Sequence, residues 1–320
     1  MQTEGMENRR GLIAALVNDG RPLLALVALS LILSGGFAIF QSATGHFLPH
    51  DEYFLGMGKQ ELCGINQCRI VHFMFHDRVS FGGALIAIGF LYLWLIEFPL
   101  RDRESWAWWL FVVSGITGFG SFLTYLGYGY LDSWHGIATL FLLIPYLWGI
   151  ARTKRTLGVQ AGLGTILQSS ERLSIRTPAA LGRVLLLLTG LGMLAGGSVI
   201  MVVGMTRIFV PQDLAYIGMS ASELNAINPR LLPLIAHDRA GFGGGVATAG
   251  LVLCLCVWCG RASRSLWQAI LIAGGIGFAC AIGIHPVIGY TDFIHLLPAY
   301  FGALIFISGI SLSYRPMCCR

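Results

Sequence analysis

Charged side chains are scarce in this chain of 320 residues: Asp, Glu, Lys and Arg make up 12% of it, against 55% hydrophobic residues. A soluble domain carries about 25% charged residues, so this chain has too little polar surface to stay in water. The net charge of +5 does not indicate nucleic acid, because the basic residues collect in particular loops and form no continuous stripe. The composition therefore indicates a membrane protein.

The motifs of soluble enzymes are also missing. We find no phosphate-binding Walker loop, dinucleotide fingerprint, serine-nucleophile elbow or zinc-protease signature in a suitable context. Glycine, in contrast, is abundant, with 42 residues, and its short spacings are typical of membrane helices that pack closely. Soluble-enzyme chemistry is excluded as a leading interpretation.

Eight apolar runs are long enough to span a bilayer, which takes about 20 residues each. They lie at 22–41, 77–97, 107–127, 133–150, 182–204, 239–259, 266–285 and 292–313. The expected fold is an all-α integral membrane protein. Its expected parts are a cytoplasmic N-terminal segment (1–21), a first four-helix unit (22–150), a basic linker (151–181), a second four-helix unit (182–313) and a tail (314–320).

The loops predict the orientation. The segment 151–183 carries six basic residues against the single acid Glu171, and shorter basic turns lie on the same side by parity. Basic loops face the cytoplasm. Both termini are then inside, in what we expect to be a bacterial plasma membrane, and the two long loops at 42–75 and 205–236 are outside. Pro49 and Pro211 are expected to begin short amphipathic helices on the outer surface.

An internal repeat relates the two units. FLPHDEYFLGMGKQEL from Phe47 aligns with FVPQDLAYIGMSASEL from Phe209, and HDRVSFGG from His76 aligns with HDRAGFGG from His237. Gly129-Tyr130 likewise matches Gly289-Tyr290. These matches occur in one order, which predicts a tandem duplication. Four helices per unit is an even number, so the two units would share one orientation in the membrane.

The repeat also filters the eight histidines. His76 pairs with His237 and His135 with His295, whereas the other four have no histidine counterpart and rank lower: His46, His50, His72 and His285. Within each unit, the two paired histidines lie near the outer start of parallel helices, at similar depth. Two imidazoles at one depth in a bundle could ligate a haem iron from both faces.

Neighbouring residues fit such a site. Asp132 and Asp292 stand three residues before a paired histidine and could orient its imidazole through the second nitrogen. Arg78 and Arg239 could meet haem propionates. The adjacent Gly-Gly pairs would admit a flat ring, although such pairs more often serve helix packing.

Two other interpretations remain open. The His-Asp-Arg clusters could be interfacial polar networks that only fix the fold of a membrane assembly or scaffold protein. They could also line two related paths for protons or an anionic solute in a transporter. A haem or quinone oxidoreductase is the leading expectation, with membrane lipid and either a quinone or a redox protein as partners.

At this point the chain resembles the heme A synthase family of membrane proteins. That family has eight helices in two four-helix halves, with a histidine pair on the second and fourth helices of each half. The resemblance implies a first-half pair at His76 and His135, and a haem b held by His237 and His295. Where the family carries a glutamate three residues before the first-half histidine, this chain has Phe73.

The first outer loop contains Cys63 and Cys68, which match the loop cysteines of that family. An oxidising outer compartment permits a disulfide between them. Two free thiols are the alternative. The second unit has no cysteine at the matching positions, so the common fold does not need the bridge.

Overall fold

The computed structural model describes residues 17–123, 130, 133–157 and 162–319, without the side chains of 133 and 135. All regular structure within these residues is helical. Each of the predicted apolar runs forms a long helix: α3 (Arg21–Ala43), α6 (Arg69–Glu97), α7 (Ser105–Phe122), α8 (Ser133–Lys154), α9 (Pro178–Thr206), α12 (Leu231–Cys259), α13 (Arg264–Ile288) and α14 (Phe293–Cys318).

Seven of these helices, all except α7, are long and apolar enough to cross a membrane. The chain is therefore an α-helical integral membrane protein. The exception, α7, is the shortest of these helices, with 18 residues.

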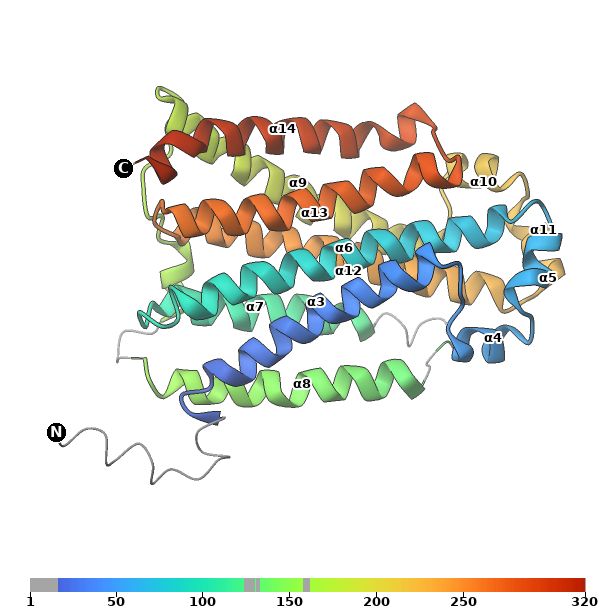
Figure 1. The fold of residues 1–320 in the computed structure, drawn as a ribbon, viewed down its shortest axis with the longest axis horizontal. Coiled ribbons are helices and arrows are strands. Elements are labelled where there is room, and N and C mark those ends of the chain that lie inside the picture. Colours follow the sequence, from blue (N-terminus) through green and yellow to red (C-terminus); the bar gives the residue numbers. More distant parts are fainter. Residues whose placement is uncertain (1–16, 124–129, 131–132, 158–161, 320) are drawn as a thin grey trace.

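Two helices form the centre of the bundle. The most apolar stretches of α6 and α12 are 78% and 72% buried inside the protein, whereas those of the other spans are 17–28% buried. Figure 1 shows α6 and α12 side by side, with α14 and α8 at opposite edges of the view. Helix α3 packs on α6, and α9 packs on α12. The packing also crosses the chain, because α13 lies against α6 and α7 lies against α12.

Glycines permit the closest of these contacts. A Cβ on Gly35 of α3 would lie 2.4 Å from the Gly82 carbonyl oxygen of α6. A Cβ on Gly197 of α9 would lie 2.6 Å from the Gly243 carbonyl oxygen of α12. Both distances are shorter than any real contact, so only glycine lets these backbones touch. The glycines that follow His76 and His237 thus serve helix packing.

Four short helices cover one end of the bundle, and we call them the roof: α4 (Pro49–Leu55), α5 (Lys59–Gly64), α10 (Pro211–Ile217) and α11 (Ala221–Ile227). Proline begins α4 and α10, as expected from the sequence. Gly56 and Gly218 end them with φ of 64° and 72°, a left-handed conformation that glycine adopts without strain. Figure 1 places the start of α3 and the end of α14 at the opposite end.

The two roof segments hold each other. Side chains at the start of α6 and just before it donate to the last carbonyls of α10, and side chains just before α12 donate to the last carbonyls of α4. The hydrogen bonds are Asn66 to Ile217 O, Arg69 to Tyr216 O (3.2 Å), Asn228 to Leu55 O (2.8 Å) and Arg230 to Phe54 O (2.7 Å). The Cys63–Cys68 disulfide is formed, and it closes the loop that carries Asn66.

The structure corrects the depth expected for two histidines. Helices α6 and α12 begin eight residues before the predicted spans at 77–97 and 239–259. The apolar residues Ile70 and Leu231 explain the early start, because they are fully buried and continue the core into the roof. His76 therefore lies about 10 Å inside its helix and not at its first turn.

Candidate functional site

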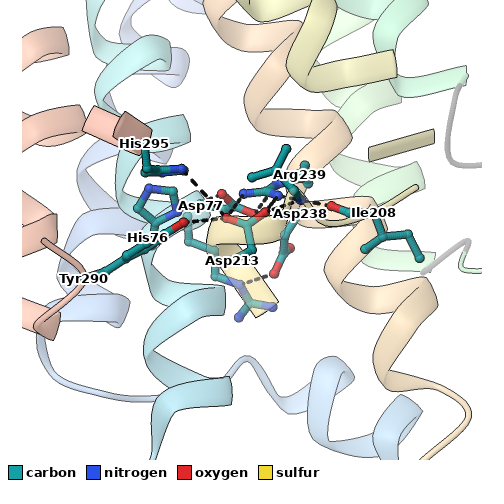
Figure 2. A network of polar contacts seen from close by, with 10 residues as sticks. His76, Asp77, Ile208, Asp213, Asp238, Arg239, Tyr290 and His295 are labelled. Atoms are coloured by element: carbon teal, nitrogen blue, oxygen red, sulfur yellow. Dashed lines mark hydrogen bonds and ion pairs between the residues drawn. The ribbon is translucent and has the colours of Figure 1, made fainter. Parts of the chain in front are cut away.

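A buried network of charged side chains lies directly beneath the roof (Figure 2). Two arginines each join two aspartates, one from the roof and one from the other central helix. The ion pairs are Arg78–Asp51 (2.8 Å), Arg78–Asp238 (2.8 Å), Arg239–Asp77 (3.4 Å) and Arg239–Asp213. The network thus binds α6 and α12 to each other and to the roof helices α4 and α10.

The network has more carboxylates than guanidiniums. Four aspartates against two arginines leave a formal charge of 2 − 4 = −2. The environment offers little water, since Asp51, Asp77, Asp213 and Arg239 are each at most 5% exposed. Uncompensated buried charge costs several kcal/mol per ion. Protons or a bound cation must therefore balance this site.

A tyrosine completes the shell of each roof aspartate. The hydroxyl of Tyr130 donates to Asp51 and that of Tyr290 donates to Asp213, both at 2.8 Å. Burial raises the pKa of both tyrosines, and the neighbouring carboxylate raises it further, so both stay protonated donors. Burial by itself would raise the pKa of Asp51, but Arg78, His50 and the Tyr130 hydrogen bond hold that pKa below its usual value.

Each aspartate of the network also faces one imidazole. Asp51 lies 3.6 Å from His50 Nε2, and the other three contacts are made by Nδ1. They are His76 to Asp77 (2.9 Å), His237 to Asp238 (3.4 Å) and His295 to Asp213 (3.9 Å). Of these contacts, the one between His76 and Asp77 is a hydrogen bond. It fixes the ring and leaves Nε2 of His76 available as an acceptor or metal ligand.

Three imidazoles converge at one side of the network. His76 of α6, His285 of α13 and His295 of α14 each offer a nitrogen, and these atoms lie within 4.8 Å of one another. The ring centroids of His76 and His285 are 4.5 Å apart, and that of His295 lies 5.8 Å from the first and 5.3 Å from the second. Tyr290 stacks on His295 at 4.4 Å. Figure 2 shows His76 and His295 facing each other beside Tyr290.

His285 was ranked low from the sequence, because the first unit has no histidine at its position. The structure places it in the three-histidine cluster, 3% exposed. Its position along the helix could have identified His285 as a site residue. It stands at the roof end of an apolar helix, as do His76 and His295, and the repeat filter removed it only because the two units differ there.

Three predicted roles differ from the contacts in the structure. Arg78 and Arg239 are both held by aspartates, not left to face an anionic cofactor. Asp292 does not contact the His295 ring: it is the N-cap of α14 and accepts the backbone N–H of His295 at 2.7 Å. N-capping satisfies a backbone donor that the helix leaves unpaired, while Asp213 takes the place near the imidazole.

The predicted site residues of the first unit are only partly placed. Asp132 and the side chain of His135 lie outside the described residues, so the structure does not test the pair of His76 with His135. His237 packs edge-on against Tyr130, with ring centroids 4.8 Å apart. His295, the expected partner of His237, is found instead beside His76.

A haem does not fit between His76 and His295. Axial ligation by these two rings would put the porphyrin plane midway between them. The ring of His285 already occupies that plane, since it lies at nearly equal distances, 4.5 and 5.3 Å, from the two other rings. The three rings instead surround a point, which suits a single ion.

The chain matches no family model, and no curated protein or solved structure is significantly similar to it. The resemblance to heme A synthase therefore rests on the residues quoted above alone.

Proposed function

We propose that this chain is a redox membrane protein that carries electrons through a cofactor centre beneath the roof. The observation that carries the proposal is the buried network of four aspartates and two arginines, with its formal charge of −2. Ionisable groups inside a membrane are costly and mark functional sites. A roofed site with almost no exposed surface suits the movement of electrons and protons better than the turnover of a large water-soluble substrate.

Eight spans, α7 included, are part of the proposal. The roof hydrogen bonds bring Asn66 and Ile217 into contact, so the chain between them crosses the membrane an even number of times. Helices α6, α8 and α9 account for three crossings, and α7 supplies the fourth. The basic residues around Arg152 and Arg261 lie at the end opposite the roof, which supports a cytoplasmic position for both termini in a bacterial plasma membrane.

A tandem duplication explains why the contacts come in pairs. Arg78 and Arg239 each join a roof aspartate to the aspartate of the other central helix, and each roof aspartate accepts a tyrosine hydroxyl. The roof hydrogen bonds are reciprocal in the same way. Because α6 packs on α13 and α12 packs on α7, the two proposed units are interleaved, and the centre lies between them.

A membrane quinone is the partner that we propose for electron exchange. A crevice of about 220 Å³ lies among α7, α9 and α12, and it is lined by Thr117, Ser121, Ser198 and Gly244, among others. Gly244 stands two helical turns below His237 on the same face of α12. The volume is below the roughly 300–1,000 Å³ of pockets for drug-sized ligands. It suits one ring, while the tail stays in lipid. The hydroxyls of Thr117, Ser121 and Ser198 donate to carbonyls of their own helices, so they offer oxygens that can accept a hydrogen bond from a quinol.

The proposal is tested by counting electrons. Purified protein in detergent is oxidised, then titrated with dithionite or with a short-chain quinol, while optical and electron paramagnetic resonance spectra are recorded. We expect reversible uptake of electrons in proportion to the chain, with either reductant. Haem b, the cofactor implied by the resemblance, would show itself here by sharp α and β bands. The absence of any reversible uptake would contradict the redox function.

The quinone part of the proposal has its own variant. Ser198→Phe fills the crevice and is expected to slow reduction by quinol at least ten-fold while reduction by dithionite is unchanged. Val199→Phe is the matched control, because Val199 is the next residue of α9 and is 61% exposed on the lipid-facing surface. Equal quinol rates in both variants would exclude the crevice as the site of electron exchange.

A further inference from the structure

The three-histidine cluster has the dimensions of an ion site. Its ligand nitrogens lie within 4.8 Å of one another and come from three separate helices, α6, α13 and α14. A tetrahedral ion at about 2.0–2.1 Å from each nitrogen needs nitrogens about 3.3 Å apart. Each pair must therefore close by no more than about 1.5 Å, which rotation of the side chains can supply.

His285 is the member of the cluster that a structural role does not explain. It is 97% buried, and neither ring nitrogen has a hydrogen-bond partner of good geometry among the described residues, although the Ala281 carbonyl one turn earlier attracts the ring weakly. A buried polar group without a partner destabilises the fold. An ion bound by one of these nitrogens removes that cost.

The surrounding carboxylates prepare the other two rings. Asp77 lies 2.9 Å from Nδ1 of His76, and Asp213 lies 3.9 Å from Nδ1 of His295. The first contact is a hydrogen bond, whereas the second is a longer electrostatic contact. Both arrangements leave Nε2 directed away from the aspartate. Histidine ligands of metals almost always have such a partner on the second nitrogen, because it fixes the ring and increases its basicity.

The formal charge also fits. The four aspartates and two arginines carry −2, and the three imidazoles are neutral ligands. A divalent ion brings the centre to −2 + 2 = 0. Balance of charge inside a medium of low dielectric constant stabilises the folded protein, and it gives a reason for the excess of carboxylates.

From these observations we infer that His76, His285 and His295 bind one divalent first-row transition-metal ion. Neutral imidazoles suit zinc, copper, iron and nickel, and copper(II) binds most tightly in this series. The inference deepens the proposed function, since copper or iron would supply its redox couple. The two fail separately: a retained ion without reversible electron uptake would leave the site standing and remove the redox function, and reversible electron uptake by a chain that retains no ion would do the reverse.

The test is metal binding by the full chain in detergent. Protein treated with chelator is reloaded separately with copper(II), zinc(II) and cobalt(II), and the metal retained per chain is measured by mass spectrometry. We expect one ion per chain, with visible cobalt bands typical of nitrogen ligands. His285→Ala should weaken the binding of each ion at least 100-fold. Asp77→Asn, which changes only the partner of His76, should weaken it about 10- to 100-fold.

His72→Ala is the matched control, since His72 stands one turn before His76 on α6 and is partly exposed. It should retain one ion with unchanged affinity. Should His285→Ala unfold, His285→Gln keeps the volume and a polar tip, and the rise in melting temperature on addition of metal gives a second measurement. That rise is expected for the wild type and the control and not for His285→Gln. Equal affinity in the wild type and the His285 variants, or no retained ion in the wild type, would overturn the inference.

Discussion

Two buried polar clusters lie at opposite ends of α6 and are built differently. Near the roof, His76 and Asp77 belong to the charged network described above. Near the other end, the cluster consists of hydroxyl groups: Tyr92 bonds the Ser114 hydroxyl at 2.7 Å, Ser114 donates to the Leu110 carbonyl at 2.6 Å, and Tyr146 donates to the Phe111 carbonyl. This second cluster carries no charge.

The difference separates a fold-supporting network from a functional one. Helices can be fixed against each other with neutral hydroxyls whose hydrogen bonds are all made, as around Tyr92. An excess of buried carboxylates and an imidazole without a partner are not needed for that purpose, and they lower stability until a cation arrives. The contrast argues against the interpretation in which the His-Asp-Arg clusters merely hold the bundle together.

Removal of Arg239 should have the largest effect on this comparison. Arg239→Met keeps an unbranched apolar stem but leaves Asp77 and Asp213 without their arginine counter-ion, and breaking a buried pair in this way costs about 3–5 kcal/mol. We expect a large fall in the melting temperature, followed in detergent by tryptophan fluorescence. Arg101→Met is the control, because the exposed Arg101–Glu97 pair contributes at most about 1 kcal/mol. Similar melting temperatures for the two variants would mean that the buried ion pairs near the roof contribute no more to stability than an exposed pair does.

Much of the fold could be predicted from the sequence. Apolar runs of about 20 residues have few alternatives to helices in lipid, and each of them is a helix here. The short roof helices followed from proline and glycine at repeated positions. The ends of the helices were harder to predict. Helices α6 and α12 begin with apolar residues that lie next to the roof, ahead of the predicted membrane spans.

The site was only partly predictable. The repeat drew attention to His76, His237 and His295, which lie beneath the roof, and it also contained the matching pairs Asp51 with Asp213 and Tyr130 with Tyr290. Partners within the site could not be derived, because they depend on which helices pack together. The bundle interleaves α6 with α13, and this brings His76 to His285, a residue without a counterpart in the first unit.

The second prediction concerns the dependence of stability on pH, which should differ between the charged network and the hydroxyl cluster. The pKa of Asp51 is lowered in the folded protein, so the stability that its ionised form contributes is present above the unfolded pKa of about 3.9 and is lost as the pH falls below about 4. Asp51→Asn removes hydrogen bonds of a charged acceptor, worth about 1.5–3 kcal/mol at neutral pH. We expect the melting temperature of this variant to change less than that of the wild type between pH 5 and pH 3. A parallel loss in both proteins would assign the acid sensitivity to other groups, and Asp102→Asn, at an exposed position, serves as the control.

The smallest effect is expected at the hydroxyl cluster. Tyr92→Phe removes the 2.7 Å hydrogen bond with Ser114 and a longer contact of 3.4 Å with the Tyr146 hydroxyl. A hydrogen bond between neutral groups is worth about 0.5–1.5 kcal/mol, and Ser114 still donates to the Leu110 carbonyl. The melting temperature should therefore fall only slightly, while electron uptake and retained metal stay at the wild-type level. Both quantities can be measured on the same preparation. If Tyr92→Phe reduced electron uptake as strongly as a change beneath the roof, the neutral cluster would belong to the electron path, and the absence of charge would no longer separate a structural network from a functional one.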